Sequence, residues 1–254
     1  MTFRAIGKEL RKLKRDGTLA TLAAVARYPA TLRKRAAYRR MLAQDDRKRK
    51  FGAIYEGGLW HSRESGSGQG SEAQYTQNLR QWLPGVIKAH GIQSIVDAPC
   101  GDFNWMRLMM PALEVDYLGV DIVDFVISTN TETYSNDRVK FAVADICKDP
   151  LPDCDLLIVR DCLFHLSNSD IDLVLQNIAG VNYRFLLTTT HTANGGFENS
   201  DIVSGDFRLI DLFESPYGFD RTSVIDRVDD FPPGYAIERE MVLIPKYAVP
   251  TSLG

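Results

Sequence analysis

The sequence predicts an α/β protein with a doubly wound, mostly parallel sheet, preceded by a helical arm. Apolar segments of strand length alternate with helical segments from Ser94 onward. Several of the strands are apolar on both faces, which is typical of parallel strands covered by helices on both sides. The chain has 254 residues, enough for one substantial core and an appendage.

The first 55 residues are predicted to form a basic helical arm. Residues 1–50 hold 16 Lys and Arg against 4 Asp and Glu, a net charge of +12 within a chain of net charge −3. Apolar residues lie at helical spacing between the basic ones: Phe3, Ile6, Leu10 and Leu13. Two interpretations stay open, namely peripheral contact with an anionic membrane through residues 1–50, or packing on the acidic body or on the partner subunit of a homodimer. Nucleic acid is not favoured, since the rest of the chain is acidic.

Residues 56–71, EGGLWHSRESGSGQGS, are rich in glycine and serine and predict a loop. The loop is either a linker or a lid over a ligand, with Trp60, His61 and Arg63 as contacts. The main domain is predicted over residues 72–254. It opens with a helix over residues 72–90, with a kink or break at Pro84.

The remaining elements follow in order. Strands are predicted at residues 94–98, 115–120, 139–143, 155–160, 183–188 and 237–244. A buried helical stripe is expected over residues 103–109, and a helix over residues 169–178 that Gly180 closes. The last strand is expected to be antiparallel, because no helix follows it.

Asp97, Asp121, Asp145 and Asp161 each lie at the carboxyl end of a predicted strand or just beyond it. In an open parallel sheet, ligands bind beyond the carboxyl ends of the strands. An acid at the end of the second strand is placed to accept hydrogen bonds from ribose hydroxyls. The first turn, DAPCGDFNW, has no G-x-G-x-x-G pattern, and Pro99 lacks the amide that a pyrophosphate would need. The pattern therefore favours a ligand with an adenosine end and a cationic end. For Asp102, a helix N-cap is an equal alternative.

Four segments, VDAPCGDFNW, YLGVDI, FAVADI and DLLIVRDCLFHLS, resemble the class I S-adenosylmethionine-dependent methyltransferases, some of which are small bacterial enzymes that act on saccharides. The resemblance implies a Rossmann-like, seven-stranded sheet with one antiparallel strand, and S-adenosyl-L-methionine as cofactor with S-adenosyl-L-homocysteine as product. It also implies a set of cofactor-binding residues: Asp97, Pro99, Cys100, Gly101, Asp102, Trp105, Asp121, Ile122, Asp145, Ile146 and Arg160. Pro99 stands where the family usually has glycine.

His165 is the first candidate for a catalytic base, because an imidazole titrates near neutral pH and this one follows a strand's carboxyl end. Asp161, four residues earlier, is expected to orient the ring. His191 is the second candidate, with a turn-stabilising role as its alternative.

The acceptor class is inferred from the loop FENSDIVSGDFRLIDL, whose polar residues suit a saccharide or another polar small molecule. A hydroxyl acceptor is favoured, with a nitrogen acceptor, a non-catalytic cofactor-binding module and an NAD-dependent oxidoreductase as alternatives. No metal site is predicted, although a divalent ion on Asp161, Asp201 or Asp206 is an alternative. The four cysteines lack metal spacing and predict reduced thiols in a cytoplasmic protein, with membrane-peripheral contact through its arm as an option.

Overall fold

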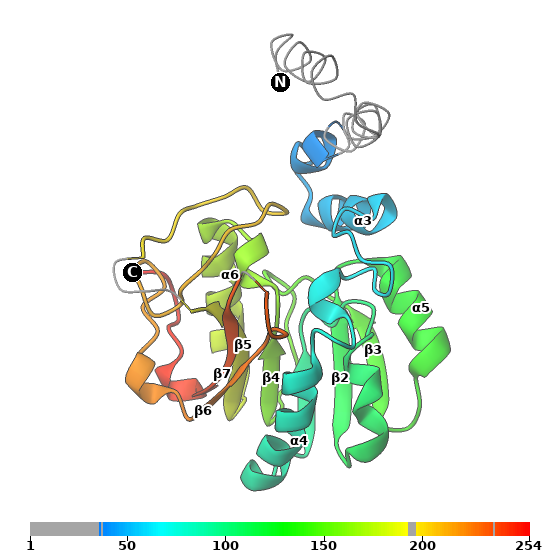
Figure 1. Ribbon diagram of the computed structural model, residues 1–254, viewed down its shortest axis with the longest axis vertical. Coiled ribbons are helices and arrows are strands. Elements are labelled where there is room, and N and C mark those ends of the chain that lie inside the picture. The colour runs from blue at the N-terminus through cyan, green and yellow to red at the C-terminus, as the bar shows by residue number, and fades with distance from the viewer. Residues whose placement is uncertain (1–35, 37, 193–196, 236) are drawn as a thin grey trace, which may run out of the picture.

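Seven strands form one sheet in the order β3-β2-β1-β4-β5-β7-β6 (Figure 1). The computed structural model describes residues 36, 38–192, 197–235 and 237–254. Its strands are β1 (Ser94–Asp97), β2 (Asp116–Asp121), β3 (Val139–Val143), β4 (Leu156–Val159), β5 (Phe185–His191), β6 (Asp226–Asp229) and β7 (Arg239–Pro245). Only β7 runs antiparallel to its neighbours, β5 and β6, while every other pairing is parallel. The predicted seven-stranded, mostly parallel sheet is confirmed.

The strand order reverses beside β1. The chain moves outward from β1 to β2 and β3, then returns so that β4 pairs with the other side of β1. Such a reversal leaves a crevice beyond the carboxyl ends of the two central strands, because the connections that follow them depart to opposite faces. This crevice is where the cavity described below lies.

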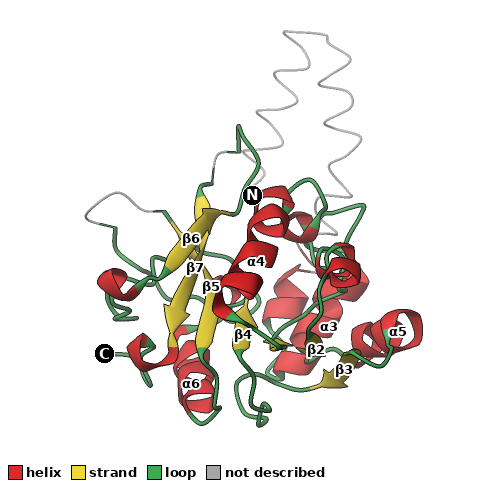
Figure 2. Ribbon diagram, turned by 90° about the horizontal axis from the view of Figure 1, so that it is seen from below, coloured by secondary structure: helices red, strands yellow, loops and turns green. Residues whose placement is uncertain are grey.

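Helices cover both faces of the sheet (Figure 2). Helix α4 (Gln77–His90) packs on one face and helix α6 (Asn168–Ala179) packs on the other. The side chains of β4 divide between the two cores: Leu156 and Ile158 face α4, and Leu157 and Val159 face α6. This division explains why the β4 sequence is apolar without alternation.

Two further α-helices, α5 and α3, lie beside the sheet and beyond its strand ends. Helix α5 (Asp124–Tyr134) packs along β2 and β3. Helix α3 (Arg47–Gly57) lies beyond the carboxyl ends of the strands (Figure 1). It begins at the N-cap Asp46, whose side chain accepts a hydrogen bond from the Arg49 amide at 2.8 Å.

Three local expectations were wrong. The segment after β1 forms two short 3-10 helices, Met106–Leu108 and Met110–Ala112, and not the α-helical stripe expected over residues 103–109. Pro111 has no amide N–H to donate and so disfavours an α-helix over this segment. Phe103, Trp105, Met106 and Met109 are nevertheless buried, whereas Leu108 is exposed. Helix α4 starts at Gln77, later than the expected residue 72, and it continues through Pro84, so the alternative of a break at that residue was wrong. Strand β6 was not predicted, because its sequence DRVD is short, polar and mostly exposed.

The amphipathic helix predicted near the N-terminus lies outside the described residues. Within the described part of the chain, no helix has both the length and the apolar character that crossing a membrane requires.

Candidate functional site

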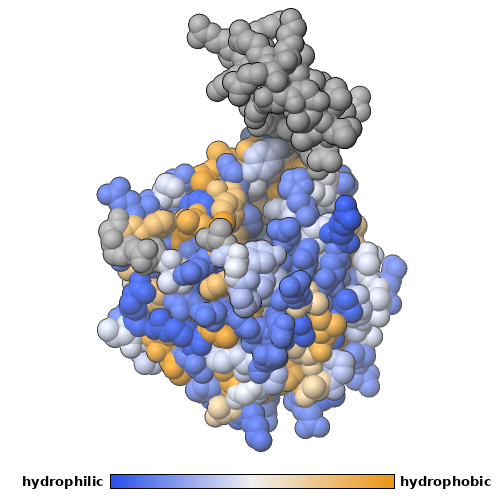
Figure 3. Space-filling model, in the orientation of Figure 1, coloured by the Kyte–Doolittle hydropathy of each residue, from blue (hydrophilic) through white to orange (hydrophobic). Residues whose placement is uncertain are grey.

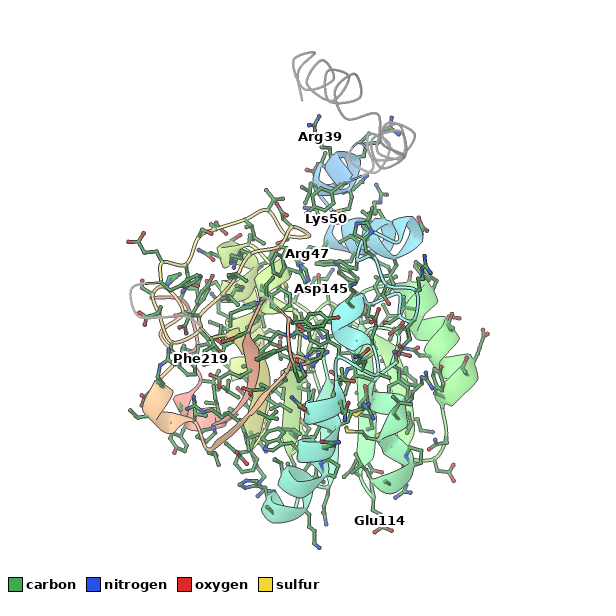
Figure 4. The ribbon with its side chains drawn as sticks, viewed as in Figure 1. Arg39, Arg47, Lys50, Glu114, Asp145 and Phe219 are labelled. Atoms are coloured by element: carbon green, nitrogen blue, oxygen red, sulfur yellow. The ribbon has the colours of Figure 1, made fainter. Side chains whose placement is uncertain are left out.

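A cavity lies at the carboxyl ends of β1, β2, β3 and β4, beneath α3. In Figure 4, Arg47 and Asp145 lie at this end of the sheet and Glu114 lies at the opposite end. Most of the residues predicted from the sequence line the cavity: Pro99, Cys100, Gly101, Trp105, Asp121, Ile122, Asp145, Ile146, Arg160, Asp161 and His165. The fold therefore brings together side chains that are up to 66 positions apart, from Pro99 to His165.

Three predicted residues do not line the cavity. Asp97 is buried beneath it and accepts a hydrogen bond from the Tyr117 hydroxyl at 2.8 Å. Asp102 points instead to the Gly/Ser-rich loop, and His191 is buried against the main chain of Ile210. Burial lowers the pKa of His191 to about 4, so this ring stays neutral in its present surroundings.

Asp121, at the end of β2, is held by main-chain amides. Its two oxygens accept hydrogen bonds from Gly101 N at 3.2 Å and Val123 N at 3.0 Å. Burial raises the pKa of Asp121 to about 6, and the amides act in the opposite direction. The carboxylate is thus fixed at the cavity wall, with little freedom to turn away.

Asp145, two residues beyond the end of β3, is paired with an arginine from α3. The Arg47 guanidinium donates to Asp145 Oδ2 from Nε at 3.1 Å and from an Nη atom at 2.9 Å. Its other Nη atom donates to Asp170, on α6, at 2.7 Å. Arg47 therefore ties α3 to the sheet and to α6 at the cavity edge.

The end of β4 carries a buried network of two arginines and two aspartates. Arg160 and Arg239 both pair with Asp161 and with Asp230. Burial acts to raise the pKa of Asp161, but the two arginines outweigh it and hold that pKa below its usual value. Arg160 and Asp161 thus present opposite charges side by side on the cavity wall.

His165 is oriented by a main-chain carbonyl and not by Asp161, which corrects the sequence-based expectation. Its Nδ1 lies 2.7 Å from the Asp206 carbonyl oxygen, while Asp161 turns to Arg239 and Thr189. Residues 163–165 form a 3-10 turn, so positions 161 and 165 do not share the face of an α-helix. Because a carbonyl only accepts, Nδ1 carries the proton and Nε2 is left as the basic nitrogen.

Burial lowers the pKa of His165, with the Asp206 carbonyl and the Asp161 charge acting in the opposite direction. The ring is therefore neutral at neutral pH. Trp60 and Phe207 lie beside it, with ring centroids 5.5 and 5.8 Å from the imidazole. The surroundings of His165 are accordingly aromatic.

Residues 197–212 form the polar loop that suggested a saccharide acceptor. Most of its polar side chains make hydrogen bonds with other groups of the protein. Asn199 donates to the carbonyls of Asp211 and Ser215, and Asp201 accepts from the amide of Asn168. Other side chains of the loop are engaged as well: Ser204 with Asp170, Asp206 with Tyr38, Arg208 with Asn168 and Tyr217, and Asp211 with Arg221. Glu198 is exposed.

The Gly/Ser-rich loop closes over the turn after β1. The Asp102 carboxylate accepts hydrogen bonds from Ser65 Oγ at 2.9 Å, Gly66 N at 2.7 Å and Ser67 Oγ at 3.0 Å. Of the three loop contacts expected for a lid, Trp60 lines the cavity, whereas His61 and Arg63 are exposed and do not.

Helix α3 supplies cavity residues that the sequence analysis missed: Arg47, Phe51 and Tyr55. Their spacing of four residues places them on one face of a helix, and this was the available signal. The sequence alone gave no reason to bring that face to the sheet, because the segment reads as part of a separate basic arm.

Among the described residues, no group of three His, Cys, Asp or Glu side chains is arranged to hold a metal ion. All four cysteines are buried and none forms a disulfide.

Comparison with known proteins supports the fold. No protein-family model and no curated protein matches the sequence. Magnesium protoporphyrin IX methyltransferase from Synechocystis PCC 6803, solved with bound SAH, is similar at 12% identity, over 87% of this chain and 99% of that one, with a TM-score of 0.50. The 1,6-didemethyltoxoflavin-N1-methyltransferase from Burkholderia thailandensis, solved with its acceptor and S-adenosylhomocysteine, is similar at 14% identity, over 65% and 77% of the chains, with a TM-score of 0.51. The chain has the fold of the class I S-adenosylmethionine-dependent methyltransferases.

Proposed function

We propose that this protein is an S-adenosylmethionine-dependent methyltransferase that acts on a hydroxyl group of a small acceptor, with His165 as general base. The observation that carries the proposal is the cavity at the strand-order reversal, into which Asp121, Asp145 and the Arg160–Asp161 pair project from successive strand ends. Fold alone does not specify chemistry, so the argument rests on these side chains.

The cavity residues fit such a cofactor. Fixed carboxylates at the ends of β2 and β3 suit the ribose hydroxyls and the adenine amino group, both of which donate hydrogen bonds. The adjacent opposite charges of Arg160 and Asp161 suit an amino-acid zwitterion. A dinucleotide fits poorly, because residues 98–115 form only 3-10 turns and offer a pyrophosphate no α-helix N-terminus.

The bound cofactor would supply an electrophilic methyl group on a sulfonium. The protein's part is to hold the acceptor hydroxyl beside it and to take its proton. The Nε2 atom of His165 suits this role, because Nδ1–H is already committed to the Asp206 carbonyl. This base favours an oxygen acceptor over nitrogen, whose lone pair attacks without prior loss of a proton.

Calorimetry tests the cofactor. We expect S-adenosylmethionine and S-adenosylhomocysteine to bind, and NAD to give no heat. Asp121→Asn should weaken binding by about tenfold or more, because a charge-assisted hydrogen bond is worth about 1.5–3 kcal/mol. Asp124→Asn is the matched control, since Asp124 is exposed and pairs with Lys48 outside the cavity. A wild-type titration without heat from either sulfur compound would end the proposal.

The acceptor is sought by transfer of a labelled methyl group into saccharide, lipid and small-molecule fractions. A polar acceptor such as a saccharide is compatible with the aromatic surroundings of His165, because sugar rings stack on aromatic side chains through their C–H faces. Product analysis then separates an O-methyl from an N-methyl group. Label found only on nitrogen would refute the hydroxyl acceptor while leaving the methyltransferase proposal intact.

A peripheral membrane role for residues 1–50 is proposed on their charge of +12. Full-length protein should co-sediment with vesicles that contain anionic lipid and should remain in the supernatant with neutral vesicles. Equal recovery from both would remove this part of the proposal.

A further inference from the structure

The loop of residues 204–206 joins two parts of the protein that lie far apart in the sequence. Asp206 carries both contacts. Its carboxylate accepts a hydrogen bond from the hydroxyl of Tyr38, in the helical segment 38–42. Its carbonyl oxygen accepts the Nδ1–H of His165 at 2.7 Å. The side chain of one residue thus faces the arm, and its main chain faces the candidate base.

The neighbouring Gly205 is closely packed from the same side. It has φ of +98°, and a Cβ atom added there would lie 2.9 Å from Lys50 Cδ and 3.1 Å from Met41 Sδ. Both of these side chains are buried. The Gly205 amide donates to the main-chain carbonyl of His165 at 2.7 Å. Met41, in the helical segment 38–42, and Lys50, in α3, therefore pack directly against the backbone that holds the histidine.

The third residue of the loop, Ser204, is anchored to the cavity edge. Its hydroxyl donates to the Asp170 carboxylate, which Arg47 also holds at 2.7 Å. The loop is therefore fixed at three successive residues. Ser204 is held by Asp170 of α6, Gly205 by the main chain of His165, and Asp206 by Tyr38 of the helical segment 38–42. Among these contacts, the hydrogen bond from the Tyr38 hydroxyl is the one that holds the side chain of Asp206 from outside the loop.

Tyr38 is suited to be a permanent donor. Burial raises the pKa of Tyr38 well above its usual value, and the Asp206 carboxylate adds to the effect, so the hydroxyl keeps its proton. An anionic acceptor makes this hydrogen bond stronger than one between neutral groups.

We infer that Tyr38 is a positioning residue for His165: through Asp206 it holds the carbonyl that fixes the ring in the Nδ1–H tautomer and leaves Nε2 free to accept a proton. The catalytic consequence rests on the proposed function, whereas the positioning itself does not. The segment before α3 is thereby a working part of the active site, and a ligand that displaces it would also release the base.

Side-chain nitrogen NMR of full-length protein tests the inference, since the chain has only 4 histidines and His165→Gln assigns the relevant signals. At neutral pH the wild type should show a protonated Nδ1 and an unprotonated Nε2 for His165. Tyr38→Phe and Asp206→Ala should each shift both nitrogens toward a mixture of tautomers, and the double variant should add little to either. Tyr247→Phe, at a residue that is 88% exposed, should leave the signals unchanged.

The outcomes separate cleanly. A shift in either variant with an unchanged control supports the inference. It is overturned if the wild-type ring is not the Nδ1–H tautomer, or if both variants keep the wild-type signals even when their melting temperature falls. The measurement needs neither cofactor nor acceptor, so a protein that fails to transfer methyl groups would still show whether Tyr38 positions the ring.

Discussion

Arg47 holds Asp145 by two N–H groups across 98 positions of sequence, and it joins α3 to the edge of the cavity. Because α3 also contributes Phe51 and Tyr55 to the cavity wall, the pair fixes one side of the proposed cofactor site.

We expect Arg47→Met to weaken cofactor binding by about tenfold, because ordering α3 would then cost free energy during binding. Lys48→Met is the control, since Lys48 pairs with the exposed Asp124 outside the cavity. Calorimetry measures both variants. Equal affinities for the two would show that α3 does not depend on its pairing with Asp145.

His165→Gln should lower kcat by about 10²–10⁴-fold and leave the cofactor dissociation constant within about twofold of wild type. The expectation follows from a ring that lines the cavity and donates from Nδ1 to a carbonyl, so that only Nε2 is available to the acceptor. Methyl transfer to the identified acceptor, together with calorimetry, measures the two effects. A comparable loss of cofactor affinity would assign the histidine to binding.

Asp97 should make the folded protein less stable as the pH rises. Burial raises the pKa of Asp97 to about 7, against a smaller opposing effect of the Tyr117 hydrogen bond. A carboxyl that holds its proton more tightly when folded favours folding at low pH, and that contribution is lost as the pH rises through about 7.

Asp97→Asn mimics the protonated form. Its stability relative to wild type should therefore increase between pH about 4 and about 8, by roughly 2–4 kcal/mol. Urea unfolding at several pH values measures the difference, which isolates Asp97 from the other titrating groups. A difference that does not change with pH would mean that Asp97 is ionised in the folded protein throughout this range.

Gly70 should tolerate no side chain. A Cβ atom there would lie 2.3 Å from Asp161 Oδ2 and 3.1 Å from an Arg239 Nη atom, both held within the buried ion network. Gly70→Ala should lower the free energy of unfolding by about 1–3 kcal/mol.

Gly85→Ala is the matched control, because a Cβ atom at this exposed position of α4 would meet nothing within 4 Å. It should raise the free energy of unfolding by about 0.5–1 kcal/mol, since alanine suits a helix better than glycine does. Denaturant unfolding of both variants tests the pair. An equal effect of the two changes would mean that the network can yield to a methyl group.

Apolar side chains reach the surface as orange areas between polar ones in Figure 3, but most of them lie in the two layers beside the sheet. Those layers follow from local patterns that the sequence carries plainly. The apolar run of β4 and the helical spacing in α6 each report burial within a few neighbouring residues. The polar edge strand β6 carries no such pattern, and so it was missed.

The sequence alone determined six of the seven strands, the antiparallel direction of β7 and the acids that end the strands. Those properties depend on residues adjacent in the chain, whose alternation and turn chemistry are local. Tertiary structure decided which acids face the cavity: Asp121 and Asp145 do, whereas Asp97 is buried beneath it and Asp102 is bound to Ser65 and Ser67.

The hydrogen-bond partners of the site residues also depend on the tertiary structure. His165 takes the carbonyl of Asp206, 41 positions away, in place of Asp161, and Arg47 reaches Asp145 from a helix assigned to the arm. Hydrogen bonds of this kind depend on where separate elements come to rest against one another. The spacing of residues within one segment cannot predict that placement, because the packing of the whole core determines it.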